Sequence, residues 1–121
     1  MHTILIVDDE PQVRKILKKV LERNNYTVLE AVDGRQGVDL FKTHGPDLII
    51  TDLIMPEKEG LEFIREIKAM DSNAQIIAIS GGGTIDPQMY LDLARKFGAV
   101  RTFSKPIDNA ILISAIKEIL T

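Results

Sequence analysis

The stretch Ile4-Leu5-Ile6-Val7-Asp8-Asp9-Glu10-Pro11 decides the fold class of this chain. Its first four residues are all apolar and do not alternate with polar residues. Such a run is typical of a strand in a parallel sheet that is covered on both faces. Three acids and a proline follow directly, and proline is favoured in the first turn of a helix. The stretch therefore predicts a buried strand, a short acidic loop and then a helix.

The same kind of unit recurs along the chain. Apolar or β-branched runs begin at residues 4, 27, 48, 76 and 100, and the intervals of 23, 21, 28 and 24 residues each leave room for one helix and two short loops. The runs at 4, 48 and 76 are apolar throughout, which predicts central strands. The last run contains Arg101 and Thr102, which predicts an edge strand. Right-handed crossovers then give an α/β fold, an open (βα)5 sandwich around a parallel sheet.

The segments between these runs carry apolar residues at helical spacing. Their predicted inward faces are Val13, Ile16, Leu17, Val20 and Leu21; Leu61, Ile64 and Ile67; Ile85, Met89, Leu93 and Phe97; and Ile111, Ala115, Ile116 and Ile119. The segment from Gly34 to Lys42 is the weakest predicted helix, because it contains two glycines.

Length and composition exclude several classes of protein. The chain has 121 residues, 45% apolar and 27% charged, which is typical of a globular domain with an exposed surface of roughly 6,500 Å². With no cysteine it has no disulfide, thiolate metal site or cysteine nucleophile. A net charge of −3 disfavours nonspecific nucleic-acid binding. No apolar run approaches the roughly 20 residues of a membrane span, and no signal peptide is evident. We therefore expect one cytoplasmic domain over residues 1–121, with no separate effector domain and no direct nucleic-acid or membrane partner.

Polar side chains follow four of the five predicted strands at the point where each strand ends. In chain order they are Asp8 and Asp9, Asp52, Ser80, and Lys105. Ligands of open α/β sheets bind beyond the carboxyl ends of the strands, so these side chains are expected to converge if those strands are neighbours. The second predicted strand ends in Glu30-Ala31, and we assign no role to that end.

Three carboxylates and one lysine at a single sheet edge predict a cation site. Clustered carboxylates repel, so one of them would be protonated near neutral pH unless a cation intervened. Oxygen ligands, without cysteine and without histidines at ligand spacing, favour a hard cation such as Mg²⁺. The two histidines, His2 and His44, are isolated in the sequence and are predicted to lie at the surface.

Each of these residues also has an ordinary structural interpretation. Asp9 could cap the first helix, and Asp52 could form a turn. Ser80 could be an ordinary loop serine before Gly81-Gly82-Gly83, and Lys105 a solvated lysine. Their joint placement at strand ends favours the functional interpretation.

The full set of motifs adds Asp52-Leu53-Ile54-Met55-Pro56, Gly60 and Lys105-Pro106. As a set it resembles the receiver domain of two-component response regulators, of the single-domain chemotaxis or phosphorelay type. The resemblance covers essentially the whole chain. It implies a flavodoxin-like five-stranded sheet with the strand order 2-1-3-4-5, and a signalling switch rather than an enzyme that turns over a substrate.

The resemblance also implies a role for each acid. Asp52 would accept a phosphoryl group. Asp9 and Asp52 would bind Mg²⁺ directly, Asp8 largely through water, and the backbone carbonyl of Ile54 would complete the protein ligands. The donor would be a sensor histidine kinase or a histidine phosphotransfer protein, and the phosphorylated surface would meet a downstream target protein.

On the other strands, the resemblance places Ser80 and Lys105 against the phosphoryl oxygens. The peptide before Pro106 is expected to be cis, which would direct Lys105 inward. Movement of Ser80 toward the phosphate would displace its loop, in which Gly81, Gly82 and Gly83 give the backbone unusual freedom.

Two positions depart from the family pattern. Many receivers carry Tyr or Phe three residues before the lysine, where this chain has Thr102. Phe103 is no substitute, because the next residue of a strand faces the other way. We therefore expect signalling to use the glycine loop and the helix that follows it.

Ile54 and Gly82 lie at the two positions that tune hydrolysis of the phosphoryl group in this family. Because Ile54 offers no polar group to orient a water, slow self-dephosphorylation is expected.

Three other functions are compatible with parts of this sequence. The first is a receiver-like interaction module that does not use phosphate, which Thr102 leaves open. The second is a phosphohydrolase with an aspartyl nucleophile, but such enzymes place an acid where this chain has Ile54. The third is a flavodoxin-like binder, in which the carboxylates would repel an anionic phosphate.

Overall fold

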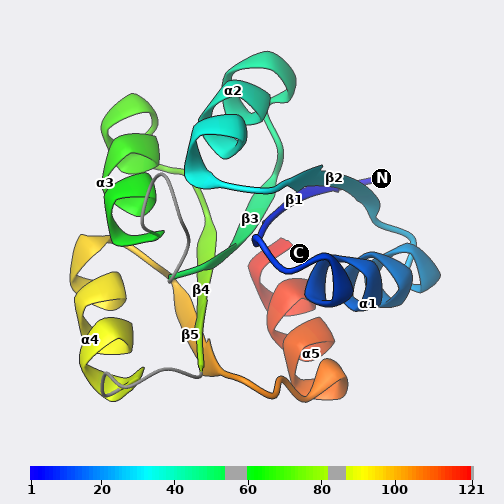
Figure 1. Ribbon diagram of the computed structural model, residues 1–121. Helices are drawn as coiled ribbons and strands as arrows, with labels where there is room; N and C mark the ends of the chain where they lie inside the picture. Colours follow the sequence, from blue (N-terminus) through cyan, green and yellow to red (C-terminus); the bar gives the residue numbers. More distant parts are fainter. Residues whose placement is uncertain (54–59, 82–86, 121) are drawn as a thin grey trace.

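The computed structural model describes residues 1–53, 60–81 and 87–120, and it shows five strands and five helices in alternation (Figure 1). The strands are β1 (Thr3–Val7), β2 (Thr27–Ala31), β3 (Leu48–Asp52), β4 (Ile76–Ser80) and β5 (Arg101–Ser104). The helices are α1 (Pro11–Arg23), α2 (Gly34–His44), α3 (Gly60–Met70), α4 (Pro87–Phe97) and α5 (Asn109–Leu120). All strand pairs are parallel, and the order is β2-β1-β3-β4-β5. The predicted fold class and strand order are both confirmed.

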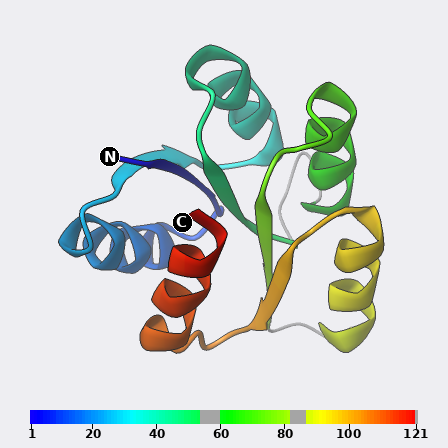
Figure 2. The same cartoon turned by 180° about the vertical axis from the view of Figure 1, so that it is seen from behind.

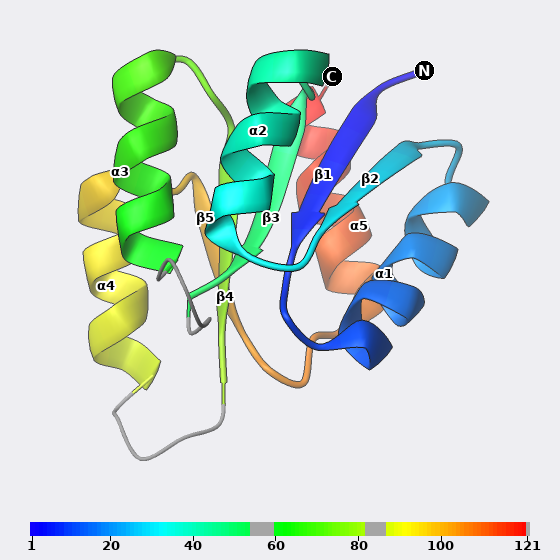
Figure 3. The same cartoon turned by 45° about the horizontal axis from the view of Figure 1, so that its top comes forward.

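Helices cover both faces of the sheet (Figure 2). Helices α1 and α5 lie on one face, and α2, α3 and α4 lie on the other, as the tilted view in Figure 3 also shows. Alternate residues of each central strand enter different cores: Ile4 and Ile6 pack toward α1 and α5, whereas Leu5 and Val7 pack toward the other helices. Strands β3 and β4 are buried along their whole length, as their uninterrupted apolar runs predict.

Three predicted core residues are instead exposed. Ile16 is 54% exposed, Met89 53% and Ile111 56%. Successive residues of a helix are about 100° apart, so a residue beside the true inward stripe is turned toward solvent. The stripes run through Leu17 and Leu21 in α1, Leu91 and Ala94 in α4, and Leu112 and Ile116 in α5. The predicted face of α1 was therefore one residue too wide, and the predicted faces of α4 and α5 were turned, because they left out the buried Leu91, Ala94 and Leu112. Ile85 lies outside the described residues.

Helix α2 forms despite its two glycines because its ends and its packing stabilise it. The Asp33 carboxylate accepts a hydrogen bond from the Gln36 backbone at the N-cap. Gly45 adopts the left-handed conformation, with φ of 55°, at the other end. Gly37 brings the helix close to the Phe63 ring on α3, where a β-carbon would lie only 2.9 Å from a ring carbon. The absence of a side chain at Gly37 therefore allows the two helices to pack closely.

The exposed surface of 6521 Å² agrees with the value expected for a compact chain of this mass. Within the described residues, no helix is both long enough and apolar enough to cross a bilayer. The four polar strand ends predicted to converge belong to β1, β3, β4 and β5, which are neighbours in the sheet.

Candidate functional site

Within residues 1–53, 60–81 and 87–120, four carboxylates gather at the carboxyl edge of the sheet. One oxygen from each of Asp8, Asp9, Glu10 and Asp52 lies within 4.8 Å of the others. Asp8 and Asp52 are buried, at 2% and 4% exposure, whereas Asp9 and Glu10 are exposed. The three acids predicted to converge therefore do so, and Glu10 joins them.

The backbone around Asp8 is held by contacts from β2 and from the start of α1. Its N–H donates to the Ala31 carbonyl of β2, and its carboxylate accepts from the Glu10 N–H at 2.9 Å. Arg14 of α1 donates from Nη1 to the Asp8 carbonyl at 2.8 Å, and the same guanidinium lies 3.5 Å from the carboxylate of Glu30. Glu30, to which the sequence assigned no role, thus helps to hold the acidic loop.

Asp9 does not cap helix α1. The N-cap residue is Glu10, and no side chain makes the capping hydrogen bond. The interpretation of Asp9 as a helix cap is therefore wrong, and its exposed carboxylate lies in the acidic cluster.

Asp52 is the last residue of β3, in register with Ile79 of β4, and not a turn residue. Gly60 at the start of α3 packs directly on its backbone: a β-carbon there would collide with the Asp52 carbonyl oxygen. This close approach explains a glycine at position 60. Ile54, whose carbonyl was expected to bind the metal, lies outside the described residues.

Lys105 reaches into the acidic cluster from the segment after β5. Its Nζ lies 3.0 Å from Glu10 Oε1, 3.4 Å from Asp8 Oδ2 and 3.4 Å from Asp52 Oδ2. Burial lowers the pKa of Lys105, but the hydrogen bond to Glu10 and the charges of Asp52, Asp8 and Glu10 raise it, and the net direction is upward. The ammonium therefore stays charged. The peptide between Lys105 and Pro106 is cis, as predicted.

Ser80 and Gly81 connect this lysine to β4. Ser80, 1% exposed, ends β4 and accepts a hydrogen bond from the Lys105 N–H at 2.9 Å through its carbonyl. A β-carbon on Gly81 would collide with the β-carbon of Lys105 and lie 2.9 Å from the backbone nitrogen of Lys105. Position 81 therefore requires glycine because the end of β4 lies so close to Lys105. This reason differs from the backbone freedom that the sequence suggested for Gly81. Gly82 and Gly83 lie outside the described residues.

The electrostatics of the cluster fit a hard cation. Burial raises the pKa of Asp8, and the Glu10 N–H and the Lys105 charge only partly offset this effect. An upward shift means that the ionised carboxylate lacks full compensation where it is buried. A divalent cation would supply that compensation, and a donor set made only of carboxylate oxygens suits Mg²⁺.

Thr102 and Phe103 lie on opposite faces of β5, as predicted. Thr102 is partly buried and in register with Ala78, whereas Phe103 packs against the core between α1, α5 and the sheet. Phe103 therefore does not occupy the position of the missing aromatic residue.

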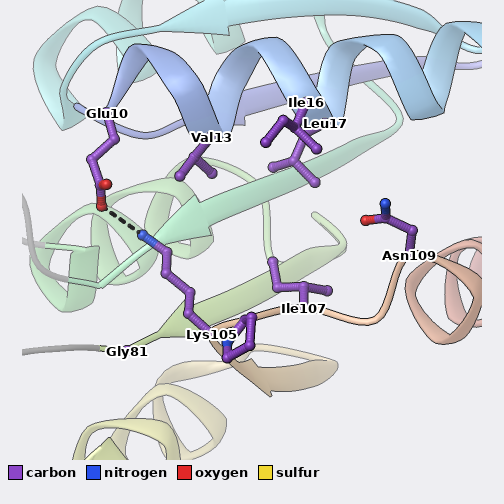
Figure 4. A pocket seen from close by; sticks show the side chains of 9 residues that line it. Glu10, Val13, Ile16, Leu17, Gly81, Lys105, Ile107 and Asn109 are labelled. Atoms are coloured by element: carbon purple, nitrogen blue, oxygen red, sulfur yellow. Dashed lines mark hydrogen bonds and ion pairs between the residues drawn. The ribbon is translucent and has the colours of Figure 1, made fainter.

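A groove of about 570 Å³ runs from the site between α1 and the β5–α5 connection (Figure 4). Glu10 and Lys105 point toward one another at one end of it, joined by their hydrogen bond. Its apolar lining comes from Val13, Ile16, Leu17, Pro106 and Ile107.

Comparison with known proteins agrees with this geometry. Residues 4–117 match the model of the response regulator receiver domain. The chain is 38% identical to chemotaxis protein CheY of Bacillus subtilis, over 98% of each chain, and 31% identical to sporulation initiation phosphotransferase F of the same organism, over 97% of this chain and 92% of that one. A crystal structure of a response regulator receiver domain protein from Clostridium thermocellum superposes with a TM-score of 0.92 at 30% identity, over 99% and 94% of the two chains. The chain therefore belongs to the response regulator receiver domain family of two-component signalling.

Proposed function

We propose that this receiver domain is a switch controlled by phosphorylation of Asp52, with Mg²⁺ required for the transfer. The observation that carries the proposal is the placement of a buried Asp52 carboxylate beside Lys105 at 3.4 Å and within 4.8 Å of three further carboxylates. Membership of the receiver family supports the same assignment.

Asp8, Asp9 and Asp52 are the residues that would hold Mg²⁺, together with the carbonyl of Ile54 outside the described residues. When bound, the cation would neutralise negative charge on the carboxylates and on the incoming phosphoryl oxygens. Hard oxygen donors gathered at one edge of the sheet, with the pKa of Asp8 raised by desolvation, support this assignment.

In the proposed transfer, an oxygen of ionised Asp52 attacks the phosphorus of a phosphohistidine on a sensor histidine kinase or a histidine phosphotransfer protein. A bond forms between that oxygen and phosphorus, the bond from phosphorus to the imidazole nitrogen breaks, and its electron pair stays on that nitrogen. The Lys105 ammonium is placed to meet the negative charge of the phosphoryl oxygens. We assign the Ser80 hydroxyl to the same oxygens, because Ser80 ends the neighbouring strand.

The signal would leave the site through β4 and β5. The carbonyl of Ser80 accepts from the N–H of Lys105, so the ends of both strands are joined at the site. Because position 102 is a threonine, we propose that the change in surface passes through Ser80 and α4 to a downstream protein rather than through an aromatic side chain of β5.

Intact mass spectrometry after incubation with acetyl phosphate and Mg²⁺ tests this function. We expect the mass of one phosphoryl group to be added to the natural protein, and none to be added to Asp52→Asn or after chelation of the metal. No gain with the natural protein, combined with unmeasurable Mg²⁺ binding, would instead indicate an interaction module that does not use phosphate.

A further inference from the structure

Among the residues that the structure describes, the carboxylate nearest to Lys105 is that of Glu10, not that of Asp52. The Lys105 Nζ lies 3.0 Å from Glu10 Oε1 and 3.4 Å from Asp52 Oδ2. Glu10 is the N-cap residue of α1, yet its side chain makes no capping hydrogen bond. Figure 4 shows the two side chains directed toward one another from opposite sides of the groove.

The backbones on both sides of this contact are fixed. The Glu10 N–H donates to the Asp8 carboxylate, and the Glu10 carbonyl accepts from the Arg14 N–H at 3.2 Å. The Lys105 N–H donates to the Ser80 carbonyl. The contact between Glu10 and Lys105 can therefore form and break by rotation of side chains alone.

An ammonium group has three N–H donors, and in the described residues three carboxylates surround that of Lys105. A phosphoryl oxygen on Asp52 would need one of these donors. The Asp8 and Asp52 side chains are 3% and 5% exposed, whereas the Glu10 side chain is 58% exposed. Water can replace the ammonium at Glu10 alone, so the contact with Glu10 costs least to break.

We propose that Glu10 is a positioning residue that shares the Lys105 ammonium with Asp8 and Asp52 before phosphorylation and competes with the phosphoryl group for it. This inference rests on the proposed function, because it requires a phosphoryl group on Asp52. Exposed ion pairs are weak, so loss of the contact should strengthen binding of a phosphoryl group by a small factor, roughly two- to fivefold.

Beryllofluoride binding in the presence of Mg²⁺ tests the competition, since this anion stands in for the phosphoryl group without turnover. The chain has no tryptophan, so we would measure affinity by titration calorimetry. Glu10→Gln should bind beryllofluoride roughly two- to fivefold more tightly than the natural protein. Glu10→Asp should also bind more tightly, because its shorter side chain keeps the charge but withdraws it from Lys105. Glu22→Gln, an exposed glutamate near the far end of the same helix, makes the same change in net charge and should have no effect.

Three results would overturn the inference. Unchanged affinity in both Glu10 variants would exclude competition. Tighter binding in Glu10→Gln alone would indicate simple repulsion between Glu10 and the anion. A loss of Mg²⁺ affinity in Glu10→Gln as large as that in Asp9→Asn would make Glu10 a metal ligand instead.

A second measurement separates this inference from the proposed function. The ammonium ¹H–¹⁵N resonance of Lys105, recorded without any anion, should shift in Glu10→Gln and not in Glu22→Gln. If the natural protein took up neither a phosphoryl group nor beryllofluoride, the proposed function would fail even where this resonance shifted. An unshifted resonance would refute the role of Glu10 whatever the function.

Discussion

Among single residues, the site depends on glycines, which have no side chain, as well as on charged residues. Gly60 lets α3 approach the backbone of Asp52, and Gly81 lets the end of β4 approach Lys105. Both glycines place backbone close to a residue assigned to the phosphoryl group. Substitutions there should therefore affect the chemistry as well as stability.

Gly81→Ala should lower the free energy of unfolding by about 1–3 kcal/mol, because the new β-carbon overlaps the backbone and side chain of Lys105. It should also slow phosphorylation by acetyl phosphate, since Lys105 must move to relieve the overlap. Gly45→Ala is the matched control: its cost comes only from a left-handed φ of 55°, with no atom within 4 Å of the added carbon. Urea unfolding and phosphorylation rates would show both effects, and an unchanged rate in Gly81→Ala would contradict this account.

The buried Asp8 predicts a dependence of stability on pH. Burial raises its pKa in the folded protein, so the folded state holds a proton more tightly than the unfolded state. Without metal, the contribution of Asp8 to stability should fall as pH rises from the unfolded pKa, about 3.8, through the raised folded value, and then stay constant.

Asp8→Asn removes the uncompensated charge, and at neutral pH without metal it should therefore raise the melting temperature. Mg²⁺ at 100 times its Kd stabilises a protein that binds it by about 2.7 kcal/mol, and this gain should be smaller in Asp8→Asn. Thermal unfolding of both proteins with and without Mg²⁺ checks the prediction. A lower melting temperature for Asp8→Asn without metal would show that the contact of Asp8 with Lys105 outweighs its desolvation.

The sequence predicted which residues end the strands but not all of their contacts. Asp8, Asp52, Ser80 and Lys105 could be placed because neighbouring parallel strands end at one edge of the sheet. The contact of Glu10 could not be predicted, because it depends on a lysine 95 residues further along the chain and on the rotamer that this lysine adopts. The sequence did contain one indication that Glu10 belongs to the site, namely its position directly after the Asp8-Asp9 pair.

At the scale of elements, α1 and β2 support the acidic loop together. Arg14 of α1 contacts both the Asp8 carbonyl and Glu30 of β2, whereas Lys18, one turn later, lies 3.6 Å from the Glu30 carboxylate. The peptide that joins Asp8 to Asp9 is therefore oriented by a side chain that does not itself belong to the acidic cluster.

Arg14→Gln should weaken Mg²⁺ binding roughly tenfold, because residues that orient metal ligands contribute on this scale. Lys18→Gln removes the same charge from the same helix and the same partner but leaves the Asp8 carbonyl untouched. Calorimetric titration with Mg²⁺ should therefore show little change in Lys18→Gln. Equal losses in the two variants would mean that only net charge matters.

The sequence predicted correctly which segments form strands and helices, but it predicted less well which face of each helix is buried. The uninterrupted apolar runs of β1, β3 and β4 identified the central strands, because residues on both faces of these strands are buried. Helical spacing was correctly predicted for α4 and α5, but the predicted faces included the exposed Met89 and Ile111 and left out the buried Leu91, Ala94 and Leu112. Apolar residues on an exposed helix face obey the same spacing as buried ones, so sequence alone could not separate them.

At the scale of the whole molecule, the sheet separates two cores and brings the ends of four strands to one site. A charge change at Asp52 can reach the surface through the Ser80 end of β4 and through α4, which packs on β4 and β5. Helix α2 packs on β1 and β2, toward the opposite edge of the sheet, away from this route.

Binding of beryllofluoride and Mg²⁺ should therefore shift the backbone amide resonances of Ser80, Gly81 and α4 more than those of α2. Because this chain has Thr102 where many receivers have an aromatic residue, we expect the change to pass through Ser80 and α4. Amide spectra recorded before and after binding would test it, and unchanged resonances along α4 would contradict it.

The proposed switch requires that Asp52 itself receives the phosphoryl group. After treatment with acetyl phosphate and Mg²⁺, borohydride reduces an aspartyl phosphate to homoserine, and peptide mass spectrometry then locates the reduced residue. We expect homoserine at position 52 alone. Homoserine at Asp8 or Asp9, or at no position while Mg²⁺ binding is intact, would contradict it.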